Sequence, residues 1–198
     1  YEILRCLVGS EMCIRDSCTG YRLDGTDTEP SMYVGTIINR SLADTTDSVT
    51  GLGDVHALVN AIGEMRRVAR EAGFIAIKVD DIAEVNARFG FDAGDRVLAE
   101  SAACLMDCSR GKGRLFRSTG PMFVALFDEL GPEAIDELAN EIERFLGSPV
   151  LIGSLEYQPP IRVATLHLNS VDRQPVSILN ELKALLGKAV QVPGTKLD

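Results

Sequence analysis

The pattern of apolar and polar positions after residue 50 changes between helical spacing and short apolar runs. Apolar residues three or four positions apart predict helices, and apolar runs bounded by turn residues predict strands. The predicted helices span about 54–72, 82–89, 93–108, 132–145 and 176–190. The predicted strands span 74–79, 115–117, 122–127, 150–152 and 161–168, the first of them central. This order predicts an α+β domain with helices packed around one mixed or antiparallel sheet.

Glycine and proline define several ends of these elements. Gly73 is predicted to end the first helix and Gly90 the second, because glycine accepts the backbone conformation that often closes a helix. Residues 118–121, Ser-Thr-Gly-Pro, predict the turn of a hairpin between two of the strands. The predicted inward positions are Leu58, Ile62, Met65 and Val68 in the first helix, Ile82, Val85 and Phe89 in the second, and Val97, Leu98, Ala102 and Leu105 in the third.

Residues 18–40 predict a separate β-hairpin. Residues 21–23 lead into a turn-rich stretch, and residues 32–38 return as a strand. Two strands cannot build a core of their own, so we expect the C-terminal hairpin of a truncated domain. We expect residues 41–50 to be a polar linker to a domain over residues 51–198.

The first seventeen residues fit neither pattern. They lack an initiator Met and the features of a signal peptide. Residues 7–17, LVGSEMCIRDS, resemble letter by letter the in-frame translation of a transposon-type sequencing-library adapter. We therefore expect residues 1–17 to be a translated adapter artefact without packed contacts, and the native sequence to begin near Cys18.

Composition narrows the classes of function. The net charge is −9 at pH 7 and becomes −8 when residues 1–17 are set aside. An acidic chain argues against general binding to nucleic acid or to anionic membranes, which rely on basic surfaces. No apolar run approaches the roughly 18 residues of a membrane span. Cys104 and Cys108 lack a second Cys/His pair for a zinc site, so we expect reduced thiols and a cytoplasmic protein.

Three segments resemble the GGDEF family, the diguanylate cyclase domain of bacterial cyclic di-GMP signalling. They are residues 47–52 (DSVTGL), like the family's opening motif, residues 86–95 (NARFGFDAGD), like its substrate-helix region, and residues 117–123 (RSTGPMF), where its signature hairpin is expected. The resemblance implies a nucleotide-cyclase or ferredoxin-like sheet. Residues 33–37 (YVGTI) resemble the last strand of a PAS sensor domain, which implies a PAS-like origin for residues 18–40.

Three acidic positions of the family are changed in this sequence. In the family, an Asp at the end of the first strand and an acidic residue in the hairpin bind the catalytic metal ions. The strand position here is Lys78, and residues 119–123 read TGPMF in place of GGDEF, so that Pro121 and Met122 replace the two acids. An ammonium and a thioether do not replace the oxygen ligands of Mg²⁺. Asp80, on the strand face of Lys78, is a poor substitute. We therefore expect a degenerate domain without catalytic residues, a metal site or a cofactor.

Two residues that contact guanine in the family are kept, namely Asn86 and Asp95. A carboxylate accepts hydrogen bonds from the ring N–H and exocyclic amine of guanine, and an amide adds another. Alternatively, Asn86 could cap a helix end and Asp95 could favour the first turn of the next helix. Lys78 is a candidate to pair with a phosphate without metal, or else a solvated strand end.

The sequence therefore predicts a catalytically inactive GGDEF-like regulatory domain, in a fragment of a cyclic di-GMP signalling protein, that keeps GTP binding. The resemblance names three candidate partners: GTP, a second copy of the chain, and a downstream EAL phosphodiesterase domain in the intact protein. Two alternatives stay open. One is an active diguanylate cyclase that makes cyclic di-GMP from two GTP molecules, and the other is a dimerisation scaffold that binds no nucleotide.

Overall fold

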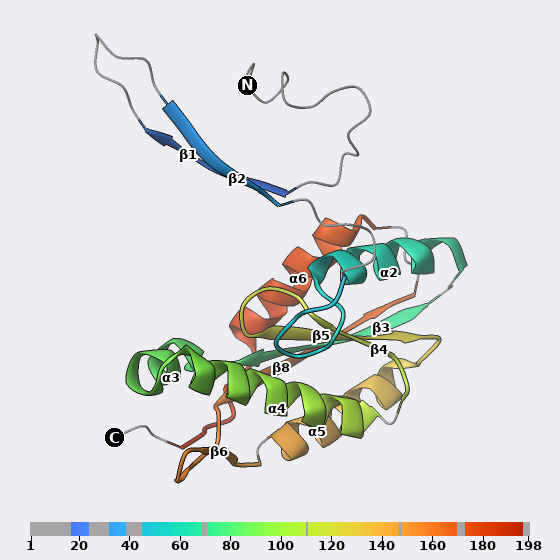
Figure 1. The fold of residues 1–198 in the computed structure, drawn as a ribbon. Helices are drawn as coiled ribbons and strands as arrows, with labels where there is room; N and C mark the ends of the chain where they lie inside the picture. Colours follow the sequence, from blue (N-terminus) through green and yellow to red (C-terminus); the bar gives the residue numbers. More distant parts are fainter. Residues whose placement is uncertain are drawn as a thin grey trace. The chain divides into compact units, whose positions relative to one another are not determined.

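The structure, a computed structural model, describes residues 17–23, 32–38, 45–68, 71–109, 111–146, 148–169 and 173–195. The chain divides into two compact units, residues 1–44 and 45–198. In the first unit, β1 (Ser17–Leu23) and β2 (Met32–Ile38) pair antiparallel, as the pattern predicts (Figure 1). The adapter prediction falls almost entirely on residues outside the described ranges, and the PAS resemblance stays a prediction.

The second unit is built on a four-stranded antiparallel sheet. Its strands, in the order β4-β5-β3-β8, are β4 (Arg114–Arg117), β5 (Met122–Asp128), β3 (Ala72–Val79) and β8 (Ile161–Leu168). The central strand β3 pairs with β5 and β8, and every residue of it except Lys78 is buried. A separate small hairpin, β6 (Val150–Ile152) and β7 (Leu155–Tyr157), completes the described strands; β7 has no counterpart among the predicted elements.

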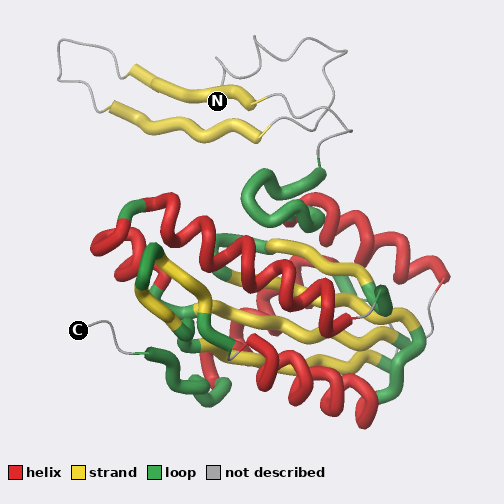
Figure 2. Tube along the Cα trace, turned by 60° about the horizontal axis from the view of Figure 1, so that its bottom comes forward, coloured by secondary structure: helices red, strands yellow, loops and turns green. Residues whose placement is uncertain are grey.

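Five helices in the described ranges cover the two faces of this sheet. They are α2 (Val55–Val68), α3 (Ile82–Phe89), α4 (Phe91–Ser109), α5 (Pro132–Leu146) and α6 (Pro175–Lys188). Helices α2 and α6 lie on one face, and α3, α4 and α5 on the other (Figure 1, Figure 2). Alternate residues of β3 point to opposite faces of the sheet. Phe74 and Ala76 lie in the core between the sheet and helices α2 and α6, and Ile75 and Ile77 lie in the core between the sheet and helices α3, α4 and α5. The predicted α+β fold class is confirmed.

The prediction that Gly73 ends a helix is wrong. Gly73 lies inside β3, where it pairs with Phe127 and His167. A Cβ at this position would lie 2.2 Å from Cδ1 of Ile135 on α5. The glycine therefore allows a helix to pack directly on the strand, and α2 already ends at Val68.

The predicted inward face of α3 is only partly correct. Val85 is fully buried, but Ile82 is half-buried and Phe89 is 43% exposed. Only one turn of this short helix contacts the core, since the helix ends at Gly90, whose φ of 88° is left-handed. The last helix ends at Lys188, and Val190, predicted to belong to it, is exposed.

Candidate nucleotide site

The end of β3 and the β4–β5 hairpin lie side by side. Lys78 is the register partner of Met122 on β5 and of Arg162 on β8, so these three residues form a row across the sheet. The Ser118 N–H donates to the Met122 carbonyl at 2.8 Å and closes the hairpin turn. The Val79 N–H donates to the Pro121 carbonyl at 3.0 Å and ties that turn to β3. Lys78, Pro121 and Met122, the three residues predicted to stand at acidic positions of the family, are therefore neighbours here.

Asp80, directly after β3, is the centre of a polar cluster at this end of the sheet. Its buried carboxylate contacts Lys78 Nζ at 2.6 Å through Oδ1, and its Oδ2 accepts hydrogen bonds from Arg162 Nε at 2.8 Å and Gln191 Nε2 at 2.9 Å. Burial raises the pKa of Asp80, but the hydrogen bonds and charges of Lys78 and Arg162 outweigh burial and lower the pKa below its ordinary value. The carboxylate is therefore ionised at neutral pH and engaged by three partners.

The residues at this end of the sheet do not fit a divalent metal ion. Mg²⁺ takes oxygen ligands, whereas Lys78 supplies an ammonium and Met122 a buried thioether. Both oxygens of Asp80 are already engaged. Within the described ranges, no group of three or more His, Cys, Asp or Glu side chains could hold a metal ion.

An open hollow of about 540 Å³ lies beside the Asp80 cluster. Its volume is in the range of small-molecule sites. It is lined by the end of β3, the hairpin turn and α3, through Lys78, Val79, Asp80, Asp81, Ile82, Ala83, Glu84, Asn86 and Pro121. Of the two predicted guanine contacts, the hollow therefore includes Asn86, whereas Asp95 is not among its lining residues.

Asn86 is positioned by a close contact between α3 and α4. A Cβ on Gly94 would lie 1.9 Å from Asn86 Oδ1, so the amide packs here because residue 94 is a glycine. Asn86 Oδ1 is buried and lacks a hydrogen-bond partner in the part of the chain that the structure describes. Asp95, the residue after Gly94, is exposed on α4. The chain therefore offers a buried acceptor and an exposed carboxylate near the contact of the two helices.

The alternative structural roles of these two residues are only weakly met. Asn86 closes α3 with its backbone, because its carbonyl accepts the Gly90 N–H at 3.0 Å, while its side-chain oxygen has no partner. Helix α4 begins at Phe91, earlier than predicted, and its first-turn acid is Asp92. Asp95 therefore lies beyond the first turn.

The loop that opens the second unit is bound to the hairpin, a contact that the sequence did not predict. Asp47 Oδ1 accepts hydrogen bonds from the Thr50 N–H at 2.9 Å and from the Thr50 hydroxyl at 2.7 Å. The same oxygen accepts one from Arg117 Nη1 at 2.9 Å, and Arg117 Nε donates to the Gly120 carbonyl at 3.0 Å. Burial raises the pKa of Asp47, but the hydrogen bonds from Thr50 and Arg117 lower it overall. The three-residue spacing of Asp47 and Thr50 was the available signal for a local turn.

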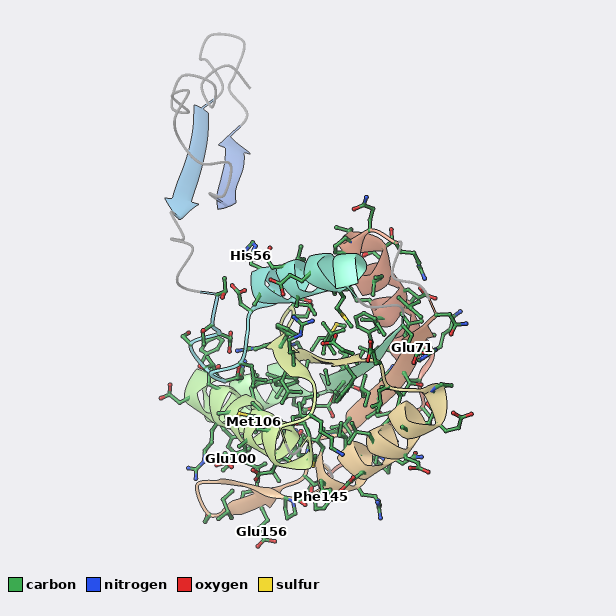
Figure 3. The ribbon with its side chains drawn as sticks, turned by 90° about the vertical axis from the view of Figure 1, so that its right-hand side faces the viewer. His56, Glu71, Glu100, Met106, Phe145 and Glu156 are labelled. Atoms are coloured by element: carbon green, nitrogen blue, oxygen red, sulfur yellow. The ribbon has the colours of Figure 1, made fainter. Side chains whose placement is uncertain are left out.

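The histidines and the helical cysteines lie outside this site. His56 is exposed on α2 (Figure 3), and His167 Nε2 lies 3.7 Å from Glu71 Oε2. Cys104 and Cys108 are reduced thiols on α4, and burial, with the neighbouring Cys108, raises the pKa of Cys104 to about 12.

None of the described helices has the length and apolar character that a membrane crossing requires.

Comparison with known families identifies the second unit. The family model described as "Diguanylate cyclase, GGDEF domain" matches residues 44–182, which is most of the chain. The chain belongs to the GGDEF family. The resemblance carried by the three sequence motifs is thereby confirmed.

Two curated relatives are similar over part of their length. The cyclic di-GMP phosphodiesterase PdeR of Escherichia coli (strain K12) is 29% identical over 113 residues, which are 56% of this chain and 17% of that protein. The diguanylate cyclase DgcS of Shewanella oneidensis is 29% identical over 84 residues, which are 40% of this chain and 28% of that protein. The matches thus span less than a third of each relative, and the two relatives' names describe opposite activities.

Solved structures share the fold. The diguanylate cyclase SiaD of Pseudomonas aeruginosa, in complex with its activator SiaC, superposes with a TM-score of 0.69 at 20% identity, over 74% of this chain and 58% of that one. The GGDEF domain of FimX from Pseudomonas aeruginosa gives 0.69 at 16% identity, over 74% and 94%. The GGDEF domain of DgcB from Caulobacter crescentus, in complex with c-di-GMP, gives 0.64 at 18% identity, over 76% and 91%.

Proposed function

We propose that this chain contains a catalytically inactive GGDEF domain that binds a guanine nucleotide and regulates a cyclic di-GMP signalling protein of the bacterial cytoplasm. The observation that carries the proposal is the row of Met122, Lys78 and Arg162 beside a hollow that Asn86 also lines. The row disfavours metal-dependent catalysis, and the hollow provides room for a ligand.

Loss of catalysis is supported by the chemistry of the row. To join two GTP molecules, the 3′-hydroxyl of one must attack the α-phosphate of the other, and metal ions stabilise the negative charge that develops. Lys78 and Met122 occupy the two family positions that would hold these ions, and Asp80 is already engaged by Lys78, Arg162 and Gln191. Among the residues that the structure describes, no group of three or more acidic, His or Cys side chains could hold a metal ion at this place, which supports the proposed loss of catalysis.

Retained binding of guanine is supported by the state of Asn86. A buried acceptor without a partner costs about 1–3 kcal/mol relative to a paired one. If the Asn86 amide turns from Gly94 towards the hollow, its Oδ1 can accept a hydrogen bond from a ligand and recover this cost, and guanine offers such donors to an amide oxygen and to a carboxylate. We assign the base to the Asn86 end of the hollow. Asp95 does not line the hollow, and we propose it as the second contact because of the family resemblance and its place next to Gly94, which packs on Asn86.

A regulatory role is supported by the connection between the hollow and the segment after α6. Gln191 donates to Asp80, and Val192 exchanges two backbone hydrogen bonds with Ile161, at 2.8 Å and 3.2 Å. A ligand that shifts Lys78 or Asp80 therefore changes how this segment is held. A second copy of the chain and an EAL phosphodiesterase domain of the intact protein are the partners we propose for this response.

The proposal is tested by nucleotide titration of the 198-residue chain in a calorimeter. GTP is expected to bind saturably and more tightly than ATP, and Asn86→Ala and Asp95→Ala are each expected to weaken GTP by about tenfold, the loss of one good hydrogen bond to the base. Asp92→Ala, at an exposed acid on the same helix, is the matched control and is expected to bind as the parent does. Equal affinities for GTP and ATP would contradict guanine recognition, and absence of binding would favour the scaffold alternative.

A further inference from the structure

We infer that Lys78 replaces the divalent metal ion of this site, so that the phosphates of a nucleotide bind here directly and without metal. The inference rests on the proposed nucleotide function and specifies what the phosphate end of the hollow recognises. Because the residues present do not fit a metal ion, phosphate binding here would differ from the metal-dependent binding that the family resemblance implies.

The charges of the Asp80 cluster leave an uncompensated cation. Lys78 and Arg162 share the single carboxylate of Asp80, so one positive charge remains without an opposite charge within the cluster. The Lys78 side chain is 43% exposed and lines the hollow, whereas that of Asp80 is 7% exposed. The Arg162 side chain is 30% exposed, but of the two cations in the cluster only Lys78 is among the residues that line the hollow.

Lys78 can turn to a phosphate at small cost to the cluster. An ammonium has three N–H donors, and the contact to Asp80 Oδ1 at 2.6 Å uses one of them. If that contact lengthens, Asp80 keeps its hydrogen bonds from Arg162 and Gln191 and does not become an unpaired buried charge. Arg162 and Gln191 therefore allow Lys78 to serve a ligand.

Two acidic residues also line the hollow, and their effect on an anion is limited. Glu84 is paired with Arg88 at 3.1 Å, and Asp81 is exposed and makes no side-chain capping hydrogen bond to α3, so its carboxylate is free to turn away from a bound anion. A divalent ion brought by the nucleotide would meet the Lys78 ammonium in place of a carboxylate ligand. A Mg²⁺–GTP complex is therefore expected to bind no more tightly than free GTP.

The test is a titration of the 198-residue chain with guanosine, GMP and GTP, each in excess EDTA and in excess Mg²⁺. GTP is expected to bind at least tenfold more tightly than guanosine in EDTA, with GTP affinities in EDTA and Mg²⁺ equal within about twofold. Lys78→Met keeps an unbranched side chain of similar length but removes its charge. It is expected to weaken the affinity for GTP about tenfold and to leave the affinity for guanosine unchanged. Lys183→Met, at an exposed lysine on α6, is the matched control.

The outcomes separate this inference from the proposed function. Guanosine binding with no added affinity for GTP in EDTA would overturn the metal-free phosphate site and leave guanine recognition intact. A GTP affinity that rises tenfold or more with Mg²⁺ would also overturn it. If neither guanosine nor GTP binds, both proposals fail. The comparison of guanosine with GTP uses the unaltered chain, so it decides the question even if Lys78→Met does not fold.

Discussion

Removal of the Asp47 carboxylate tests whether the opening loop stabilises the hairpin. Asp47→Ala deletes two hydrogen bonds from Thr50 and the ion pair with Arg117 at 2.9 Å. The Asp47 and Arg117 side chains are 22% and 15% exposed, so we take the low end of the range for a charged hydrogen bond, about 1.5 kcal/mol, and about 1 kcal/mol for the Thr50 contacts together. The expected loss in free energy of unfolding is about 2–3 kcal/mol.

The assay is urea denaturation of the parent, Asp47→Ala, Arg117→Ala and the double variant. The two residues contact each other, so the cycle is expected to give a coupling of about 1–1.5 kcal/mol. Glu64→Ala is the matched control, because its pair with Arg114, at 3.2 Å, has side chains that are 69% and 37% exposed and is worth less than about 0.5 kcal/mol. A coupling near zero, or a loss for Asp47→Ala as small as that for Glu64→Ala, would show that the opening loop does not stabilise the hairpin.

Three further outcomes are expected. Gly73→Ala should lower the free energy of unfolding by about 1–3 kcal/mol, because the new methyl group would overlap Ile135. Gly63→Ala, in open space on α2, should raise it by up to about 1 kcal/mol. Equal effects of the two substitutions in urea denaturation would show that residue 73 is not packed tightly against Ile135. The fold lowers the pKa of Asp80, so this carboxylate stabilises the fold above its ordinary pKa of 3.8, and the stabilisation is lost as pH falls through the pKa of the folded state. The unfolding temperature of Asp80→Asn should therefore decrease less in acid than that of the parent. An identical decrease in both proteins would contradict a stabilising role for the Asp80 carboxylate. The buried Tyr157 hydroxyl has no partner among the described atoms, and burial and nearby carboxylates raise the pKa of the phenol to about 12. Tyr157→Phe should therefore leave the free energy of unfolding unchanged or raise it by up to about 1 kcal/mol. A decrease of more than about 1 kcal/mol would show that the hydroxyl has a hydrogen-bond partner.

The sequence correctly predicted the elements in which apolar residues recur at regular spacing because one face packs against the sheet. Val97, Leu98, Ala102 and Leu105 were predicted to face inward and are all buried on α4. Gly73 was misassigned because glycine both ends helices and permits close packing, and the residue that decides between these roles, Ile135, is distant in the sequence. Local pattern cannot distinguish the two cases.

The candidate site was predictable only where a single position carried the information. Lys78 and Met122 could be compared with the family one residue at a time, and the structure places them as register partners. The cluster around Asp80 could not be foreseen, because Arg162 and Gln191 are 82 and 111 positions away from it. Those contacts depend on the pairing of β8 with β3 and on the path of the chain after α6.

The most direct test of the proposed function is a GTP titration of the 198-residue chain in Mg²⁺ buffer, followed by analysis of the same samples for cyclic di-GMP. We expect saturable binding of GTP, complete recovery of the GTP and no cyclic di-GMP. Formation of cyclic di-GMP above the level of a protein-free sample would contradict the proposed loss of catalysis, because two GTP molecules would then have been joined at a site where we propose that Lys78 and Met122 stand in place of metal ligands.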